Sequence, residues 1–97
     1  LRIYTINAGM MDSWLKLFKE EIAPRVKKAG MGIQTAWVNQ ERTQFIWIRT
    51  YDSIEDIKVK DAAFYGTDFW KTHVDRIRGH LAHRESVVIE PFLPNGI

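Results

Sequence analysis

Residues 31–51 read MGIQTAWVNQERTQFIWIRTY and predict a β-hairpin at the centre of the chain. The segments 31–39 and 44–51 are short and rich in β-branched and aromatic residues, as strands are. Residues 40–43 between them are all polar and are typical of a hairpin connection. We therefore expect two antiparallel strands that are neighbours in one sheet.

Alternation assigns the side chains of these two strands to opposite faces of the sheet. In the second strand, Ile46 and Ile48 share one face, and Phe45, Trp47 and Tyr51 share the other. In the first strand, the two predicted faces are Ile33, Thr35 and Trp37 against Gln34, Ala36 and Val38. Because neither face of the second strand is polar, we expect both faces of the sheet to be covered.

The chain on either side of the hairpin supplies the remaining strands and helices. Residues Leu1–Ile6 predict a strand, and residues Met10–Ala29 predict a helix whose apolar side chains recur at helical spacing. Residues Ile54–Phe64 and Phe69–Ala82 predict two further helical segments. Residues Glu85–Phe92 predict the last strand.

Single residues mark where these helices begin and bend. Ser53, with Asp56 three residues later, resembles a capping box before the second helical region. Thr67 can cap a new helix after the break at Gly66. Pro24 lies inside the first helix and should bend it or loosen one turn.

The predicted order β-α-β-β-α-β is that of an α+β, ferredoxin-like fold. In this fold a four-stranded antiparallel sheet carries both helices on one face. The length of 97 residues suits one domain, so we expect residues 1–97 to form a single domain.

Two helices cover only one face of such a sheet, which leaves the other apolar face without a cover. A patch of that size exceeds what a monomer normally exposes. The sequence therefore predicts a homodimer packed sheet to sheet, with Trp37 and Trp47 in the interface. The alternative is a monomer in which one of these tryptophans is half-exposed.

Composition excludes several classes of function. The chain has no cysteine, so it has no disulfide, thiolate zinc site or cysteine nucleophile. Its net charge of +2 comes from scattered basic residues, which argues against nucleic-acid binding. No apolar run approaches the ~20 residues of a membrane span, and no signal peptide is recognisable, so we expect no membrane association and a cytoplasmic location.

Three histidines are the residues most suited to chemistry. His73 and His80 are seven residues apart, which on the predicted helix 69–82 places them nearly in line at the edge of the core. One of them could serve as a general acid or base or as a ligand in a pocket there, and the alternative is a half-solvated histidine at the rim. His80 and His83 have the spacing of a pair of metal ligands, but no carboxylate or cysteine completes the ligand set, so we expect no metal site.

Aromatic side chains give the second lead to a site. Trp14 and Trp70 should face inward from their helices, and Tyr4 on the first strand could bring a hydroxyl group into a cavity. Arg25, close to the apolar stripe of the first helix, could meet an anionic group, or it could lie over the surface beside Glu21.

The chain resembles NIPSNAP-type domains over nearly its whole length, at anchors that keep their order and spacing. These anchors are Leu1–Gly9, Trp14, Pro24, Gly30, the run Ile48–Ile54, Asp68-Phe69-Trp70 and Glu90-Pro91-Phe92. The resemblance implies a dimeric α/β barrel and no particular reaction. Haem-degrading enzymes of the same fold place an Asn at the end of the first strand and a Trp and a His on the second helix, which Asn7, Trp70, His73 and His80 match in type.

The sequence thus predicts a NIPSNAP-like protein that binds a small apolar or aromatic molecule between its helices and sheet, without cofactor or metal. The expected lining is Tyr4, Asn7, Trp70, His73 and Ile77. The alternatives are a cofactor-independent monooxygenase of the antibiotic-biosynthesis type, a haem-binding or haem-degrading protein, and a purely structural module. Whether the protein is an enzyme stays open at this point.

Overall fold

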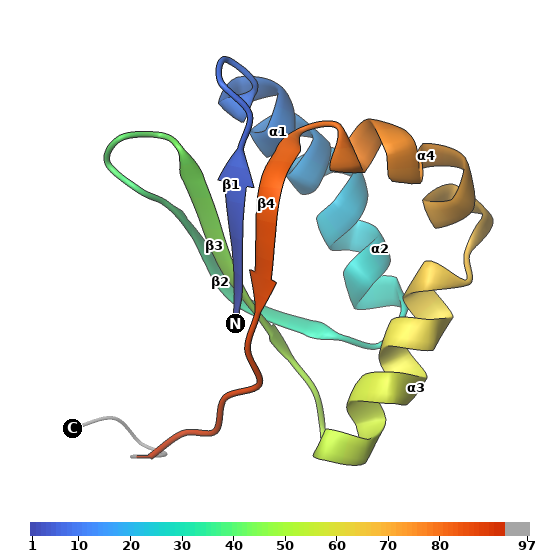
Figure 1. Cartoon of the computed structure of the whole chain (residues 1–97). Helices are drawn as coiled ribbons and strands as arrows, with labels where there is room; N and C mark the ends of the chain where they lie inside the picture. Colours follow the sequence, from blue (N-terminus) through green and yellow to red (C-terminus); the bar gives the residue numbers. More distant parts are fainter. Residues whose placement is uncertain (93–97) are drawn as a thin grey trace.

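The computed structural model describes residues 1–92, and residues 93–97 lie outside the description (Figure 1). Four strands, β1 (Arg2–Ile6), β2 (Gly32–Val38), β3 (Gln44–Thr50) and β4 (Leu81–Ser86), form one sheet in the order β2-β3-β1-β4. All three neighbouring pairs are antiparallel. The helices lie on one face of this sheet (Figure 1). This is the predicted ferredoxin-like arrangement.

The β2–β3 hairpin forms as its sequence predicts, and a single side chain closes the turn. The Asn39 side-chain oxygen accepts hydrogen bonds from the backbone N–H groups of Thr43 and Gln44, each at 2.8 Å. Arg42 adopts a left-handed backbone conformation with φ 57°. This turn fixes the register in which Val38 lies opposite Phe45.

The first helical region runs from residue 11 to residue 28 and widens in its middle. It consists of α1 (Met11–Leu17), a π-helical segment (Phe18–Ile22) and α2 (Ala23–Lys28). Pro24 lies in the first turn of α2, where its missing N–H costs least. The widened turn directly before it confirms that the proline loosens one turn without ending the helix.

Two helices, α3 (Ile54–Tyr65) and α4 (Asp68–Arg78), begin at the predicted caps. The Ser53 hydroxyl accepts a hydrogen bond from the Asp56 backbone N–H at 3.1 Å, and the Thr67 hydroxyl accepts one from that of Trp70 at 3.2 Å. Each bond satisfies one N–H group in the first turn of its helix. Among the helices described, none is long and apolar enough to cross a membrane.

The predicted end of the last helix is wrong, and so is the start of the last strand. The helix ends at Arg78, not Ala82, and β4 spans Leu81–Ser86 where residues 85–92 were expected. The reason is tertiary, because the end of β1 captures the chain just after α4. The Asn7 side chain donates to the Gly79 carbonyl at 2.9 Å, and the Asn7 backbone N–H donates to that of His80 at 2.8 Å.

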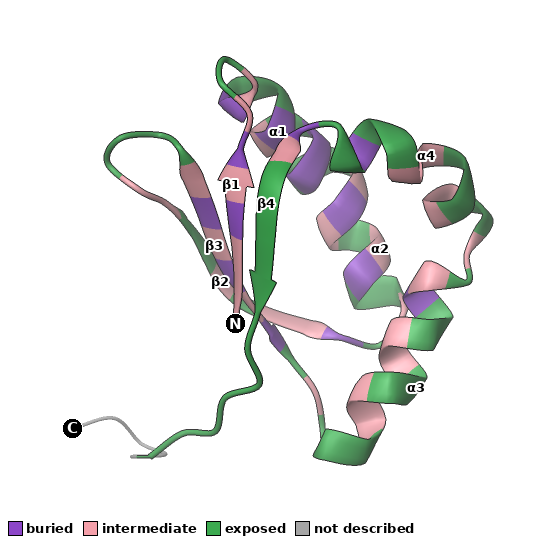
Figure 2. Cartoon of the chain, viewed as in Figure 1, coloured by how far each residue is buried: buried purple, intermediate pink, exposed green. Residues whose placement is uncertain are grey.

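The predicted dimer interface is wrong in one of its two tryptophans, because Trp47 lies on the helix-facing side of the sheet. Trp47 lies opposite Ala36 and Arg2 and is only 1% exposed, because it packs under the helices against Phe18. Buried residues alternate with less buried ones along β3 (Figure 2). Trp47 is therefore part of this chain's own core and not of the open face. A register shift between Ile33 and Thr35 likewise places Ile33 on the opposite face from Trp37.

The core between sheet and helices is built mainly from aromatic rings. Trp14 lies 5.7 Å from both Tyr4 and Phe45 between ring centroids, with edge-to-face geometry in each pair. Phe18 lies 4.6 Å from Phe45 and 5.0 Å from Trp47. Such contacts add to the area that each ring buries, so this cluster gives a 97-residue chain a dense centre.

Candidate functional site

A small cavity lies between the sheet and the helices beside this aromatic core. Its volume is about 30 Å³, which is room for about two water molecules. Three of the five predicted ligand-binding residues line it, namely Tyr4, Trp70 and Ile77. The other lining residues are Arg2, Trp14, Ile22, Trp47, Arg49, Phe64, Tyr65, Arg78, Leu81 and Arg84.

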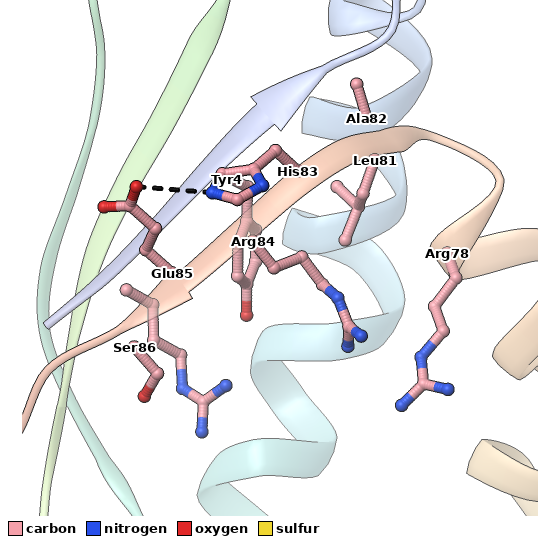
Figure 3. Close-up of a pocket in the computed structure, with 9 residues that line it drawn as sticks. Tyr4, Arg78, Leu81, Ala82, His83, Arg84, Glu85 and Ser86 are labelled. Carbon is pink, nitrogen blue, oxygen red and sulfur yellow. Dashed lines mark hydrogen bonds and ion pairs between the residues drawn. The ribbon is translucent and has the colours of Figure 1, made fainter.

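A larger hollow of about 570 Å³ runs along β4 and meets this cavity (Figure 3). The two share the side chains of Arg2, Tyr4, Arg78, Leu81 and Arg84. Figure 3 shows the guanidinium groups of Arg78 and Arg84 on the same side of β4 as the Tyr4 hydroxyl group. The small inner cavity and the solvent-facing hollow are therefore neighbours that share part of their walls.

A second hollow, of about 680 Å³, lies between the end of β3, α3 and the segment that follows β4. It shares Arg2 and Arg49 with the inner cavity. Arg2 thus lines the inner cavity and both hollows described here, and Arg49 lines the inner cavity and the second hollow.

Arg49 is a buried cation held by α3. Its side chain is 5% exposed and lies 3.2 Å from the Asp61 carboxylate and 3.0 Å from the Tyr65 hydroxyl oxygen. Burial disfavours the charged guanidinium, but Tyr65, Tyr4 and Tyr51 outweigh burial and raise the pKa of Arg49 above its usual range. Arg49 is therefore a fixed positive charge beside the cavity.

Tyr51, just after the end of β3, joins the hydrogen-bond network of Arg49, Asp61 and Tyr65. Its hydroxyl donates to the same Asp61 oxygen at 2.6 Å. Burial, followed by this hydrogen bond, raises the pKa of Tyr51 above 10.0, although Arg49 opposes the shift. The phenol therefore stays protonated to a higher pH in the folded protein than in the unfolded chain.

Three buried N–H donors around the cavity have no hydrogen-bond partner among the described residues. They are Nε1 of Trp14, Nε1 of Trp47 and Nε of Arg49, and all three residues line the inner cavity. A buried donor without an acceptor is costly, and native structures contain few of them. Three of the residues that line the cavity therefore each hold one N–H donor without an acceptor.

His80 and Asn7 are used by the fold itself. His80 is 4% exposed, and its Nδ1 donates to the Arg76 carbonyl at 2.8 Å while the Ser13 hydroxyl lies 2.8 Å from its Nε2. Asn7 holds the α4–β4 connection through Gly79. Neither residue lines a cavity described above.

His73 lies on α4, where its half-buried ring stacks on Phe69 at 4.7 Å between centroids and donates to the Phe69 carbonyl at 2.9 Å. Arg25 stands over the same Phe69 ring, 3.9 Å from its centroid, and donates to the Glu21 carbonyl. His73 and Arg25 therefore flank one aromatic side chain. They do not line the inner cavity.

His83 points away from the helices, where its Nε2 lies 3.3 Å from the Glu85 carboxylate on the open side of β4 (Figure 3). His80 and His83 thus do not converge on one point. Within residues 1–92, no group of three or more His, Cys, Asp and Glu side chains could hold a metal ion.

The arginines around the cavity are what the sequence reasoning missed as a group. Arg2 and Arg49 fall within predicted strands, Arg78 falls within a predicted helix, and Arg84 falls in neither, and the sequence predicts no site role for any of the four. A signal was nevertheless present, because Arg2 is two residues from Tyr4 and Arg49 is two residues from Trp47. In a strand that spacing places each arginine on the same face as its aromatic neighbour.

Comparisons with known proteins identify similar sequences and structures. A family model described as NIPSNAP matches residues 1–93. A crystal structure of an uncharacterized NIPSNAP domain protein from Burkholderia xenovorans is 24% identical, with a TM-score of 0.81 and 96% of this chain and 94% of that chain covered. A NIPSNAP family protein from Agrobacterium tumefaciens is also 24% identical, with a TM-score of 0.80 and coverages of 95% and 83%. A further Agrobacterium tumefaciens protein is 17% identical, with a TM-score of 0.87 and coverages of 96% and 91%.

None of the curated proteins matches the chain. At identities below one quarter, the solved structures support the fold and carry no function across.

Replacing Asp61 by Asn should destabilise the protein by about 1–3 kcal/mol, because Arg49 then stays buried without a counter-charge. The free energy of unfolding in urea measures this change. Asp12→Asn is the matched control, because Asp12 is an exposed carboxylate paired with Arg42, and its effect should stay within about 0.5 kcal/mol. Equal effects of the two substitutions would contradict the role given to Asp61.

The free energy of unfolding should fall more steeply above pH 10 in the wild-type chain than in Tyr51→Phe. The folded state raises the pKa of Tyr51, so its contribution is complete below 10.0 and is lost as the pH rises through the folded-state value. Urea unfolding between about pH 9 and pH 11 measures it. Parallel curves for the two proteins would refute this linkage.

Proposed function

The chain belongs to the NIPSNAP family, and on that premise we propose that it binds a small molecule with an apolar or aromatic body between its helices and its sheet. The observation that carries the proposal is that the 30 Å³ inner cavity and the 570 Å³ hollow along β4 share five lining residues. The hollow supplies volume, and the inner cavity adds aromatic side chains beside it. Most ligand pockets combine an apolar wall with a few placed polar groups in this way.

Tyr4, Trp70 and Ile77 contact the ligand in this proposal, because they line the inner cavity. The Trp70 ring lies 4.8 Å from that of Tyr65 and 5.4 Å from that of Phe64 between centroids, so it is held by its neighbours. Asn7 and His73 line neither space: Asn7 holds the α4–β4 connection, and His73 packs on Phe69.

In the monooxygenase and haem alternatives, His73 or His80 would act as proton acceptor or as iron ligand. Neither of these two histidines lines a described cavity, and His83, which lines the outer hollow, is paired with Glu85. Ligand binding without chemistry therefore accounts for the described residues better than either enzyme alternative.

Homodimerisation through the open face of the sheet is the second part of the proposal. None of the helices within residues 1–92 covers this face (Figure 2). It carries Trp37 at 47% exposure together with the half-buried Ile3, Ile46 and Ile48. A second copy would bury this surface and extend a small core. In that dimer, residues 1–97 act as one domain, and the absence of cysteine suits a reducing cytoplasm.

A neutral fluorescent probe, phenylnaphthylamine, should bind the wild-type protein and bind Leu81→Trp at least about tenfold more weakly. Leu81 lines both the hollow and the inner cavity, so an indole at this position fills the space between them. Fluorescence titration measures the affinity, and circular dichroism checks that the variant is folded.

Val59→Trp is the control for that experiment, because Val59 is an exposed residue of α3 that lines none of the cavities. It should bind the probe as the wild type does. Equal binding by all three proteins would place the probe elsewhere and refute the proposed site.

Light scattering should give a mass of twice the 11.4 kDa of one chain for the wild type and one times that mass for Trp37→Glu. A carboxylate at this position would be buried in the interface without a partner. Val59→Glu adds the same charge on α3 and should remain dimeric. A monomeric wild type, or a dimeric Trp37→Glu, would contradict the open-face dimer.

A further inference from the structure

We propose that the bound molecule is an acid, whose carboxylate, sulfonate or similar oxyanion group is held by Arg78 and Arg84 over the hollow, with Arg2 and the buried Arg49 beneath. This inference rests on the proposed function, since it names the class of ligand for the same site. Four arginines line the inner cavity, and its lining includes no carboxylate.

The negative charges nearby do not neutralise this cluster. Asp61 lies 3.2 Å from Arg49 and 3.9 Å from Arg2, so one carboxylate serves two guanidinium groups. Glu85, at the edge of the hollow, is paired with His83 on the other side of β4. Within residues 1–92, Arg78 and Arg84 have no carboxylate within ion-pair distance, although both are exposed enough to find one.

The strand register explains how these arginines meet. Arg84 of β4 lies directly opposite Tyr4 of β1, and the next helix-facing pair along the strands is Ser86 and Arg2. Arg78, at the end of α4, stands over the Trp70 ring with its guanidinium carbon 5.5 Å from the ring centroid. The guanidinium groups of Arg78 and Arg84 therefore lie on the side of β4 to which the Tyr4 hydroxyl group points (Figure 3).

The buried donors point to the same class of ligand independently of the surface charges. The Arg49 side chain is 5% exposed, lines the cavity and has an Nε without an acceptor, as do the indole N–H groups of Trp14 and Trp47. All three atoms can donate and none can accept. A ligand group rich in acceptor oxygens would match these unpaired donors.

The presence of arginine side chains favours an oxyanion as the ligand group over a negative charge without paired oxygens. Guanidinium groups present planar, paired N–H donors that match the two oxygens of a carboxylate or sulfonate, and they stack on aromatic faces. The cationic side chains that line the inner cavity and the hollow are arginines, without a lysine among them. An aromatic or aliphatic acid would meet both the arginines and the rings.

A matched pair of probes tests this class of ligand on the full chain. Anilinonaphthalenesulfonate and neutral phenylnaphthylamine share one ring system and differ in the sulfonate group. We expect the anionic probe to bind at least about tenfold more tightly than the neutral one at equal ionic strength. In the double variant Arg78→Gln/Arg84→Gln, this advantage should fall to within about twofold, while binding of the neutral probe is unchanged.

Two control variants and one substitute variant separate the cluster from other sources of binding. Arg42→Gln/Arg76→Gln removes two arginines outside the cavities, each paired with a carboxylate, and should keep the advantage. Trp37→Glu changes the open face of the sheet and should also keep it. If the double variant at Arg78 and Arg84 does not fold, Arg84→Gln alone should lose most of the advantage.

The outcomes decide between the two levels of proposal. Equal affinity for both probes, an unchanged double variant, or the same loss in the Arg42/Arg76 control would overturn the acidic ligand while leaving ligand binding in place. Loss of binding in Trp37→Glu would move the anionic probe to the open face and overturn the inference as well. If neither probe binds the wild type, the proposed function itself fails.

Discussion

Side chains alternate between the two faces of β1 and β3, and this alternation determines which side chains the helices cover. From one end of β1 to the other, the helix-facing side chains are Ile6, Tyr4 and Arg2, and the corresponding face of β3 ends with Arg49. The covered face of the sheet therefore changes from apolar to cationic along its strands. Aromatic packing closes the apolar end, but the cationic end does not pack dry, and it is there that the cavity and hollows lie.

The cost of burying Arg49 explains how α3 docks on the sheet. A buried guanidinium loses its hydration unless oxygens replace the water. Those oxygens come from Asp61 and Tyr65 on α3, and Tyr51 reinforces Asp61. The helix has almost no amphipathic pattern to hold it, since Ile54 and Val59 are exposed and Phe64 is its one buried residue. A polar network, more than apolar burial, therefore sets where α3 sits.

Local patterns predicted the elements well, and long-range contacts account for the errors. The hairpin, the loosened turn at Pro24 and the caps at Ser53 and Thr67 all follow from neighbouring residues. The end of α4 does not, because it depends on Asn7, more than 70 residues away in the sequence. The cluster of arginines was equally hidden, because four residues from three strands and a helix meet only through the register of the sheet. Tyr4, Trp70 and Ile77 could be predicted since each lies on an apolar face.

The two faces of the sheet offer two independent surfaces. Trp37 and its neighbours lie on the open face, while Tyr4 and the arginines lie under the helices. The hollow follows β4, an edge strand, so a second copy on the open face leaves the opposite side of that strand reachable from solvent. Because no residue of the inner cavity belongs to the open face, dimerisation makes no direct contact with that cavity, although His83 and Glu85, at the edge of the hollow, lie on the open side of β4. Disrupting the proposed dimer should therefore act on stability first and on binding only through it.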